Sequence, residues 1–221
     1  MAPVPGRDDA DRDWLLWQLM DSAFPTGGFA HSAGLEAAWQ HGEIRQRDQL
    51  FSFVEAGLLQ LGHAALPLVT AAHADPGQLP ALDRLCDAFT SNHVANRASR
   101  LQGRAFLTAA QKIFEVSVPE SPFLHYAPVL GASLRALEVT SESSDRLFFF
   151  SHLRGVLAAA VRLNIVGPME AQILQRRLAP AAEKVIADCL TLTLDDLAQT
   201  SPLLDLWQGA QDRLYSRLFQ S

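Results

Sequence analysis

The chain has 221 residues, of which 48 % are hydrophobic and 19 % charged, a composition that excludes a disordered protein and allows a sizeable buried core. Its net charge of −6 disfavours general affinity for nucleic acid or for an anionic membrane surface. The two cysteines, Cys86 and Cys189, are far apart and form no CxxC pair, which argues against a disulfide framework and fits a reducing compartment.

The amino end differs in composition from the rest of the chain. Residues 1–12 mix proline, aspartate and arginine without an apolar run, so they predict a flexible tail rather than a secretory signal. We therefore expect a cytoplasmic protein with one domain over residues 13–221, in which residues 202–221 form a terminal helix and tail.

The predicted elements are all helices. Apolar residues recur at spacings of three and four along most of the chain, and no run of alternating β-branched residues predicts a strand. Helices are expected at 14–21, from the Gly27-Gly28 pair to 40, at 48–74 with an interruption between Gly62 and Pro67, and at 80–89, 92–116, 123–137, 146–166, 169–178, 180–189 and 202–219. The prediction is an all-α fold, a single compact bundle of roughly nine to eleven helices.

Between the first two predicted helices, residues 21–36 form the densest cluster of proline, glycine and small residues. Pro25 suits the end of one element, and Thr26 can cap the next with its side-chain oxygen. In the helix expected there, a flat stripe for close packing would be made by Ala30, Ala33, Gly34 and Ala37. No Lys-Ser or Lys-Thr follows the glycine pair, so the pattern favours a tight interhelical turn over a phosphate-binding loop.

Two further stretches leave alternatives open. Arg97, Arg100 and Arg104 recur on one face of the 92–116 helix, which indicates a solvated face, an anion site or one side of a protein interface. Residues 146–166 are the most apolar, but His152, Arg154 and Arg162 interrupt the ~20 apolar residues that a membrane span requires. Likewise, Ser141–Asp145 is expected to be a turn that caps the following helix.

Seven histidines invite a metal hypothesis, yet none forms the HxxxH or HExxH spacing that places two ligands on one helix face. No Gly-x-Ser-x-Gly nucleophile elbow is present either. We therefore expect no catalytic residue, no metal ligand and no tightly bound cofactor. The alternative left open is a small helical metal carrier or enzyme that uses His31, Glu36, His125 and His152.

Several ordered segments together resemble the urease accessory protein F family (UreF). They are LLWQLMDSAFPTGGFAHSAGLE at 15–36, NRASRLQGR at 96–104, HYAPVLG at 125–131, AVRLN at 160–164 with Gly167 and Gln172 after it, and RLFQS at 217–221. The positions of these segments that become candidates for partner binding are Asp21, Ser22, Pro25, Gly27, Gly28, Phe29, His31, Ser32, Gly34, Glu36, Asn96, Arg97, Arg100, Gln102, Gly103, His125, Gly131, Arg162, Gln172, Arg217, Leu218, Phe219 and Ser221.

The resemblance implies a homodimeric all-α protein without catalytic activity of its own. It also implies assembly with urease accessory protein D (also called H) and with the GTPase, accessory protein G, to deliver nickel to apo-urease. Nickel is implied only through that complex, and neither nucleic acid nor a membrane is an expected partner. The amino-terminal segment and the terminal tail are implied in binding the D-type partner. We hypothesise that Gly27, Gly28 and Gly34 hold a helix pair close and so present His31, Ser32 and Glu36 in a fixed geometry.

Overall fold

The computed structural model describes residues 9–221, in which ten α-helices and four short 3-10 turns occur and no β-strand does. The helices are α1 (Asp9–Met20), α2 (Leu35–Gln40), α3 (Arg47–Ala64), α4 (Leu66–Ala74), α5 (Leu79–Phe89), α6 (His93–Phe114), α7 (Tyr126–Ala136), α8 (Ser141–Arg162), α9 (Pro168–Cys189) and α10 (Pro202–Ala210). The 3-10 turns are η1 (Gly28–Ala30), η2 (Pro76–Gln78), η3 (Leu194–Asp196) and η4 (Gln211–Arg213). The prediction of an all-α bundle is confirmed.

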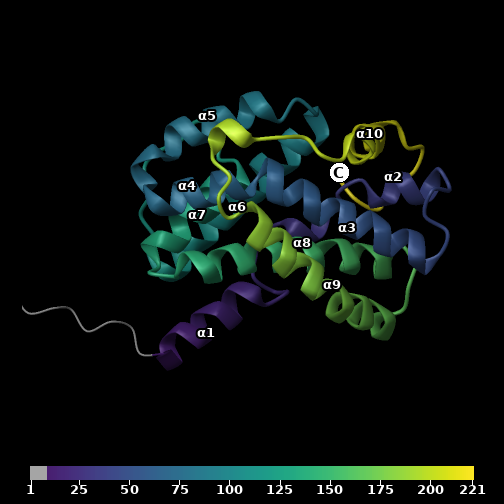
Figure 1. The fold of residues 1–221 in the computed structure, drawn as a ribbon, viewed down its shortest axis with the longest axis horizontal. Helices are drawn as coiled ribbons and strands as arrows, with labels where there is room; N and C mark the ends of the chain where they lie inside the picture. The colour runs from purple at the N-terminus through teal and green to yellow at the C-terminus, as the bar shows by residue number, and fades with distance from the viewer. Residues whose placement is uncertain (1–8) are drawn as a thin grey trace, which may run out of the picture.

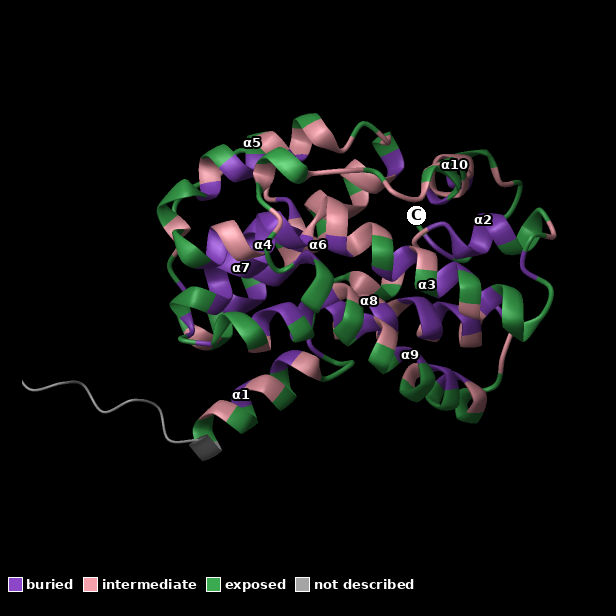
Figure 2. Ribbon diagram, in the orientation of Figure 1, coloured by how far each residue is buried: buried purple, intermediate pink, exposed green. Residues whose placement is uncertain are grey.

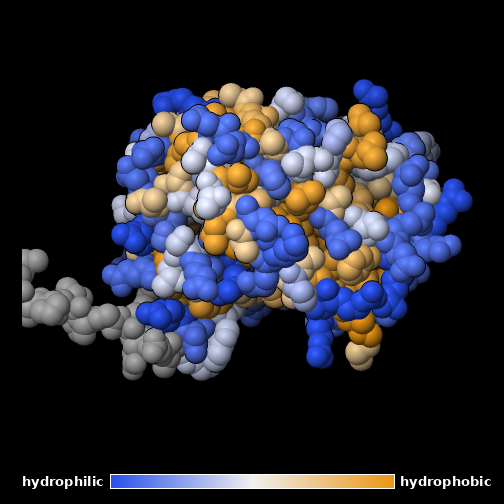
Figure 3. Space-filling view, viewed as in Figure 1, coloured by the Kyte–Doolittle hydropathy of each residue, from blue (hydrophilic) through white to orange (hydrophobic). Residues whose placement is uncertain are grey.

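The helices pack around a shared apolar interior. Helix α7 lies against α4 and α6, while α8 and α9 pack against each other and against α3 (Figure 1). Buried residues line the inward faces of these helices (Figure 2), and Phe106 of α6 and Phe149 of α8 are among the largest wholly buried side chains. The face of the molecule in Figure 3 is largely hydrophilic with apolar patches between, one of them over α10.

Two glycines set how closely α7 approaches its neighbours. A Cβ on Gly103 of α6 would lie 2.8 Å from the backbone nitrogen of Tyr126, and one on Gly131 of α7 would lie 3.0 Å from the carbonyl carbon of Val69. Both distances are shorter than van der Waals contact, so only glycine allows these backbones to meet. Gly103 and Gly131, predicted as partner-binding candidates, therefore have a packing role.

The expected helix from the glycine pair to residue 40 is wrong. After the single turn η1, His31 is extended, and Ala33 and Gly34 then take left-handed angles (φ 54° and 85°) before α2 begins at Leu35. These positive φ angles break the helix, so the small residues do not form a stripe on one helix face.

The terminal helix is also shorter than predicted. It ends at Ala210 rather than 219, and after η4 residues 214–221 run on without regular structure. Two smaller corrections concern helix starts. Ser141–Asp145 is the first part of α8, which Thr140 caps by accepting from the Ser143 amide at 3.2 Å. Pro180 lies inside the continuous helix α9 instead of separating two helices.

Of the tail predicted at residues 1–12, residues 1–8 lie outside the described part of the chain, whereas 9–12 belong to α1. No single helix within residues 9–221 is long and apolar enough to cross a membrane. Only α3 and α4 taken together, across the bend between them, have the combined length and composition.

Replacing Gly131 by alanine should destabilise the protein by about 1–3 kcal/mol, because the new methyl group must push α4 and α7 apart. Gly155→Ala is the matched control in α8, since a Cβ there meets no atom within 4 Å. The control should gain up to about 1 kcal/mol from helix propensity. Urea denaturation measures both, and an equal effect of the two substitutions would contradict the close approach.

Candidate partner-binding site at the joined ends of the chain

The two segments that the sequence places at opposite ends of the chain lie side by side in the structure. We call residues 21–36 the glycine-rich segment and residues 214–221 the terminal tail. The amide of Gln220 donates to the carbonyl of Ala30 at 2.8 Å, and the amide of Ser32 donates to the carbonyl of Ser221. The C-terminus consequently sits next to α2 and α10 in the ribbon (Figure 1).

Glu36 is the main attachment point for the terminal tail. Its carboxylate is only 2 % exposed. It accepts from the amides of Leu218 (2.6 Å) and Phe219 (3.1 Å) and from the side-chain amide of Gln211 (2.6 Å). Position in the first turn of α2 also places the negative charge at the favourable end of the helix dipole. Together with a longer hydrogen bond from the side-chain amide of Gln40 (3.4 Å), these donors compensate a buried carboxylate that would otherwise be costly.

The glycines of the segment differ in what they do. Gly34 has φ 85°, and a Cβ on it would lie 2.9 Å from the backbone nitrogen of Gln208, so it admits α10 against the segment. Gly27 is left-handed at φ 71° but has ordinary space around it, and Gly28 shows neither feature. The hypothesis that glycines bring two elements close is therefore supported for Gly34, and the element they admit is α10.

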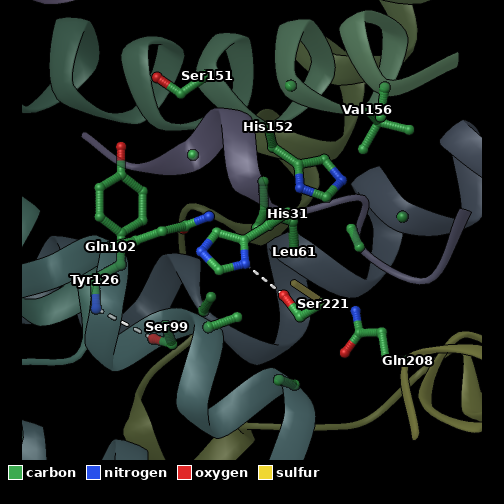
Figure 4. Close-up of a pocket in the computed structure, with 18 of the residues that line it drawn as sticks. His31, Leu61, Ser99, Gln102, Tyr126, Ser151, His152, Val156, Gln208 and Ser221 are labelled. Carbon is green, nitrogen blue, oxygen red and sulfur yellow. Dashed lines mark hydrogen bonds between the residues drawn. The ribbon is translucent and has the colours of Figure 1, made fainter. Parts of the chain in front are cut away.

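His31 and Ser221 meet at the end of the tail. The Nδ1 atom of His31 contacts the hydroxyl of Ser221, and both residues are buried (Figure 4). Burial, with a smaller contribution from the positive charge of Arg97, lowers the pKa of His31 to about 4. The imidazole is therefore neutral at physiological pH and makes a neutral hydrogen bond with the tail.

Arg162 of α8 contacts both the glycine-rich segment and the terminal tail. Its guanidinium stacks on the ring of Phe29 at 4.1 Å and on the ring of Phe219 at 4.2 Å, and it donates to the carbonyl of Phe29. Phe219 is 4 % exposed, so the tail also contributes a side chain to the core. Such cation–π contacts are worth about 0.5–2 kcal/mol each.

The predicted arginine stripe is divided between different partners. Arg97 makes two hydrogen bonds to Asp212, at 2.8 and 3.1 Å, and Arg217 of the tail reaches the same carboxylate at 2.9 Å. The hydrogen bond from Arg97 is the main reason that the pKa of Asp212 is lowered. Arg100 stacks on Phe123 at 5.0 Å. These pairs are exposed and add little stability, but they position the residues that lead into the tail.

A second polar cluster lies away from the tail and was only partly predicted. The Nε2 atom of His125 donates to the carboxylate of Asp87 at 3.1 Å, and its Nδ1 atom hydrogen-bonds with the hydroxyl of Ser99 at 3.1 Å. Asn96 also donates to Asp87, at 3.0 Å. Asp83, wholly buried, accepts the amides of residues 123, 124 and 125. Neither Asp83 nor Asp87 was a sequence candidate, and the only local signal that could have indicated a shared partner is their spacing of four on α5.

The remaining candidates do not join the tail site. Asp21 accepts from the Ala23 amide at 2.8 Å and shapes the turn after α1. Ser22 and Pro25 are exposed on the same turn, and Gln172 is exposed on α9.

Gln211, which sequence reasoning missed, is wholly buried and donates a hydrogen bond to Glu36. Nothing in its local sequence distinguishes it from a surface glutamine.

The metal-carrier alternative gains no geometric support. Within residues 9–221 no three His, Cys, Asp or Glu side chains form a group that could hold a metal ion. Glu36 is committed to the tail, His125 to Ser99 and Asp87, and His31 to Ser221. Three of the four residues of that alternative are therefore engaged in separate contacts, and His152 hydrogen-bonds to none of them.

Comparison with known proteins decides the family. The UreF family model matches residues 44–179. The chain belongs to the UreF family. A urease accessory protein F of Oryza sativa subsp. indica is 38 % identical over 219 residues, covering 93 % of this chain and 84 % of that protein. The protein of that name in Arabidopsis thaliana is 38 % identical over 232 residues (99 % and 96 %). The urease accessory protein UreF of Trichodesmium erythraeum is 26 % identical over 227 residues (96 % and 97 %). Membership of this family assigns the chain to urease maturation.

Replacing Glu36 by glutamine should loosen the terminal tail, because a neutral amide accepts more weakly and its NH₂ group opposes backbone donors. The expected loss is about 2–3 kcal/mol of tail attachment. Carboxypeptidase should then release Ser221 faster from the variant than from the wild type. Glu43→Gln, at an exposed position just after α2, is the control and should leave the release rate unchanged. Equal rates in all three proteins would contradict the role of Glu36.

Acid should weaken the fold through His31. The unfolded chain takes up a proton on this residue near pH 6.5, whereas the folded chain does so only near pH 4. The stability that depends on the neutral imidazole is complete above pH 6.5 and is lost as the pH falls toward 4. In urea denaturation across that range, His31→Asn should lose less stability than the wild type, by up to about 3 kcal/mol. Parallel pH profiles would contradict the assignment.

Proposed function

We propose that this chain is a non-enzymatic adaptor of urease maturation, acting in the cytoplasm as a homodimer. It bridges the D/H-type accessory protein and the G-type GTPase and supports nickel insertion into apo-urease. Membership of the UreF family supports a role in urease maturation. The adaptor role is inferred from the surface formed where the glycine-rich segment, α10 and the terminal tail meet.

That surface presents exposed apolar side chains on elements that inner contacts hold in place. Leu203 and Leu206 of α10 are each 65 % exposed, Phe29 of the segment is 65 % exposed, and Tyr215 of the tail is fully exposed. The inner contacts of Glu36 and Arg162 hold these elements in place. A protein partner can bury these apolar side chains with little loss of conformational entropy, because they are already ordered and are surrounded by polar residues.

The composition of the surface also argues for a protein partner rather than a substrate. The inward-facing Glu36 and His31 already have hydrogen-bond partners within the site, namely Gln211, the tail amides and Ser221. We assign the D/H-type protein to this surface, because the matched amino-terminal and carboxyl-terminal segments both contribute to it.

Co-purification tests the proposal. The full chain is expressed with the D/H-type and G-type proteins and apo-urease, and urease activity is measured after nickel addition, with and without this chain. The proposal predicts a complex with both partners and activation that depends on the chain. Activation that is equal without it would refute the adaptor role.

The double variant Leu203→Ser with Tyr215→Ser should weaken capture of the D/H-type protein by about tenfold or more, since each removes an exposed apolar contact without touching the core. Met169→Ser with Leu190→Ser is the matched control, because both residues are exposed on or just after α9. Affinity is measured by surface plasmon resonance. Equal loss in the two pairs would place the partner elsewhere.

A further inference from the structure

A cavity of about 530 Å³ lies under the glycine-rich segment, between α3, α6 and α8. Its walls are largely apolar, with contributions from Phe53, Leu61, Val94, Phe148, Val156 and Leu204. Exposed residues of the segment, such as Ala23 and Pro25, also line it, so the cavity reaches the surface. Its volume lies in the range of small-molecule sites, roughly 300–1,000 Å³.

Three polar side chains from different elements project into this space (Figure 4). They are Gln102 of α6, His152 of α8 and Gln208 of α10. None of the three side chains has a hydrogen-bond partner among residues 9–221, although each carries both a donor and an acceptor. All three residues are half-buried and line the cavity, so their polar groups are available to hydrogen-bond with a molecule that enters it.

The two histidines that line the cavity are uncharged. Burial lowers the pKa of His152 to about 4, as it does that of His31, so both imidazoles are uncharged at physiological pH. Arg154 and Arg162, which also line the cavity, direct their guanidinium groups to backbone carbonyls of Met20 and Phe29. A charged group placed beside His152 and Gln102 would therefore lose its hydration without gaining an opposite charge from these two side chains.

We propose that this cavity binds a neutral small molecule with an apolar body and one hydroxyl or amide group, which hydrogen-bonds to His152 and Gln102. The apolar walls take up the body of the ligand, and the two side chains fix the orientation of its polar group. This site lies beneath the partner surface and shares Phe29 with it, but its hydrogen-bonding groups, His152 and Gln102, belong to α8 and α6.

The first test uses the purified full chain and 1-naphthylmethanol as the probe, followed by calorimetry. Saturable binding of one molecule per chain is expected. The anionic analogue 1-naphthoate and the cationic analogue 1-naphthylmethylamine should bind at least about tenfold more weakly, because each would bury a charge. Absence of saturable binding, or equal binding of a charged analogue, would overturn the proposal.

A cavity-filling variant locates the probe. Gly155 lines the cavity, and a Cβ there meets no atom within 4 Å, so Gly155→Leu should occupy the space and weaken probe binding by about tenfold or more. Gly167→Leu is the matched control, since its Cβ is equally unobstructed and it does not line the cavity. Circular dichroism checks folding, and Ala98→Phe on the α6 wall replaces Gly155→Leu if that variant unfolds. Unchanged binding to a folded, filled variant would overturn the proposal.

The role of the polar groups is tested with a ligand that lacks the hydroxyl. His152→Leu and Gln102→Leu should each weaken binding of 1-naphthylmethanol by about tenfold while leaving 1-methylnaphthalene within about twofold. Equal changes for both ligands would mean that these side chains only shape the cavity, and would overturn their assignment as hydrogen-bonding residues.

Discussion

The carboxylate of Glu36 has to be buried and satisfied for the two ends of this chain to stay together. The carboxylate accepts hydrogen bonds from Gln211, Leu218 and Phe219, so it is bound both by the turn after α10 and by the tail itself. Neighbouring contacts depend on the same arrangement. The stacking of Arg162 on Phe219 requires the tail to lie in this position, because the ring enters the core only there. The hydrogen bonds to this one carboxylate thereby hold in place a terminal tail, a kind of segment that ordinarily frays.

Helical periodicity predicted most elements because the apolar faces of α3, α5, α6 and α9 repeat every three or four residues and are buried as that spacing requires. The same periodicity failed after Ala210, where spaced leucines continue but the amides of the tail bond to Glu36 instead of to the preceding turn. That contact joins residues 182 positions apart, and no local pattern records it. Asp83 was not predicted for a similar reason. A polar residue on an amphipathic helix usually faces solvent, whereas Asp83 is wholly buried and accepts hydrogen bonds from the amides of residues 123–125.

The segments that carry the family resemblance divide into two kinds of physical role. Gly103 and Gly131 set the spacing of helices, and His125 and Asn96 both hydrogen-bond to Asp87 of α5, so these positions support the fold. A single surface with exposed apolar groups is supported by His31, Gly34, Glu36 and the last residues of the tail. A rigid, pre-ordered surface suits a protein that acts by assembly, since little entropy is lost when a partner binds. The inward-facing Gln102, which neither role uses, belongs to the cavity beneath.

Amide hydrogen exchange of the isolated full chain tests the joining of the two ends most directly. The amides of Ser32, Leu218, Phe219 and Gln220 each donate to an acceptor on the opposite end of the chain. They should therefore exchange as slowly as the helical amides of α2, although three of them lie within the last four residues of the protein. Exchange of these amides at the rate of an unstructured peptide, while α2 remains protected, would contradict a tail that is fixed before any partner binds.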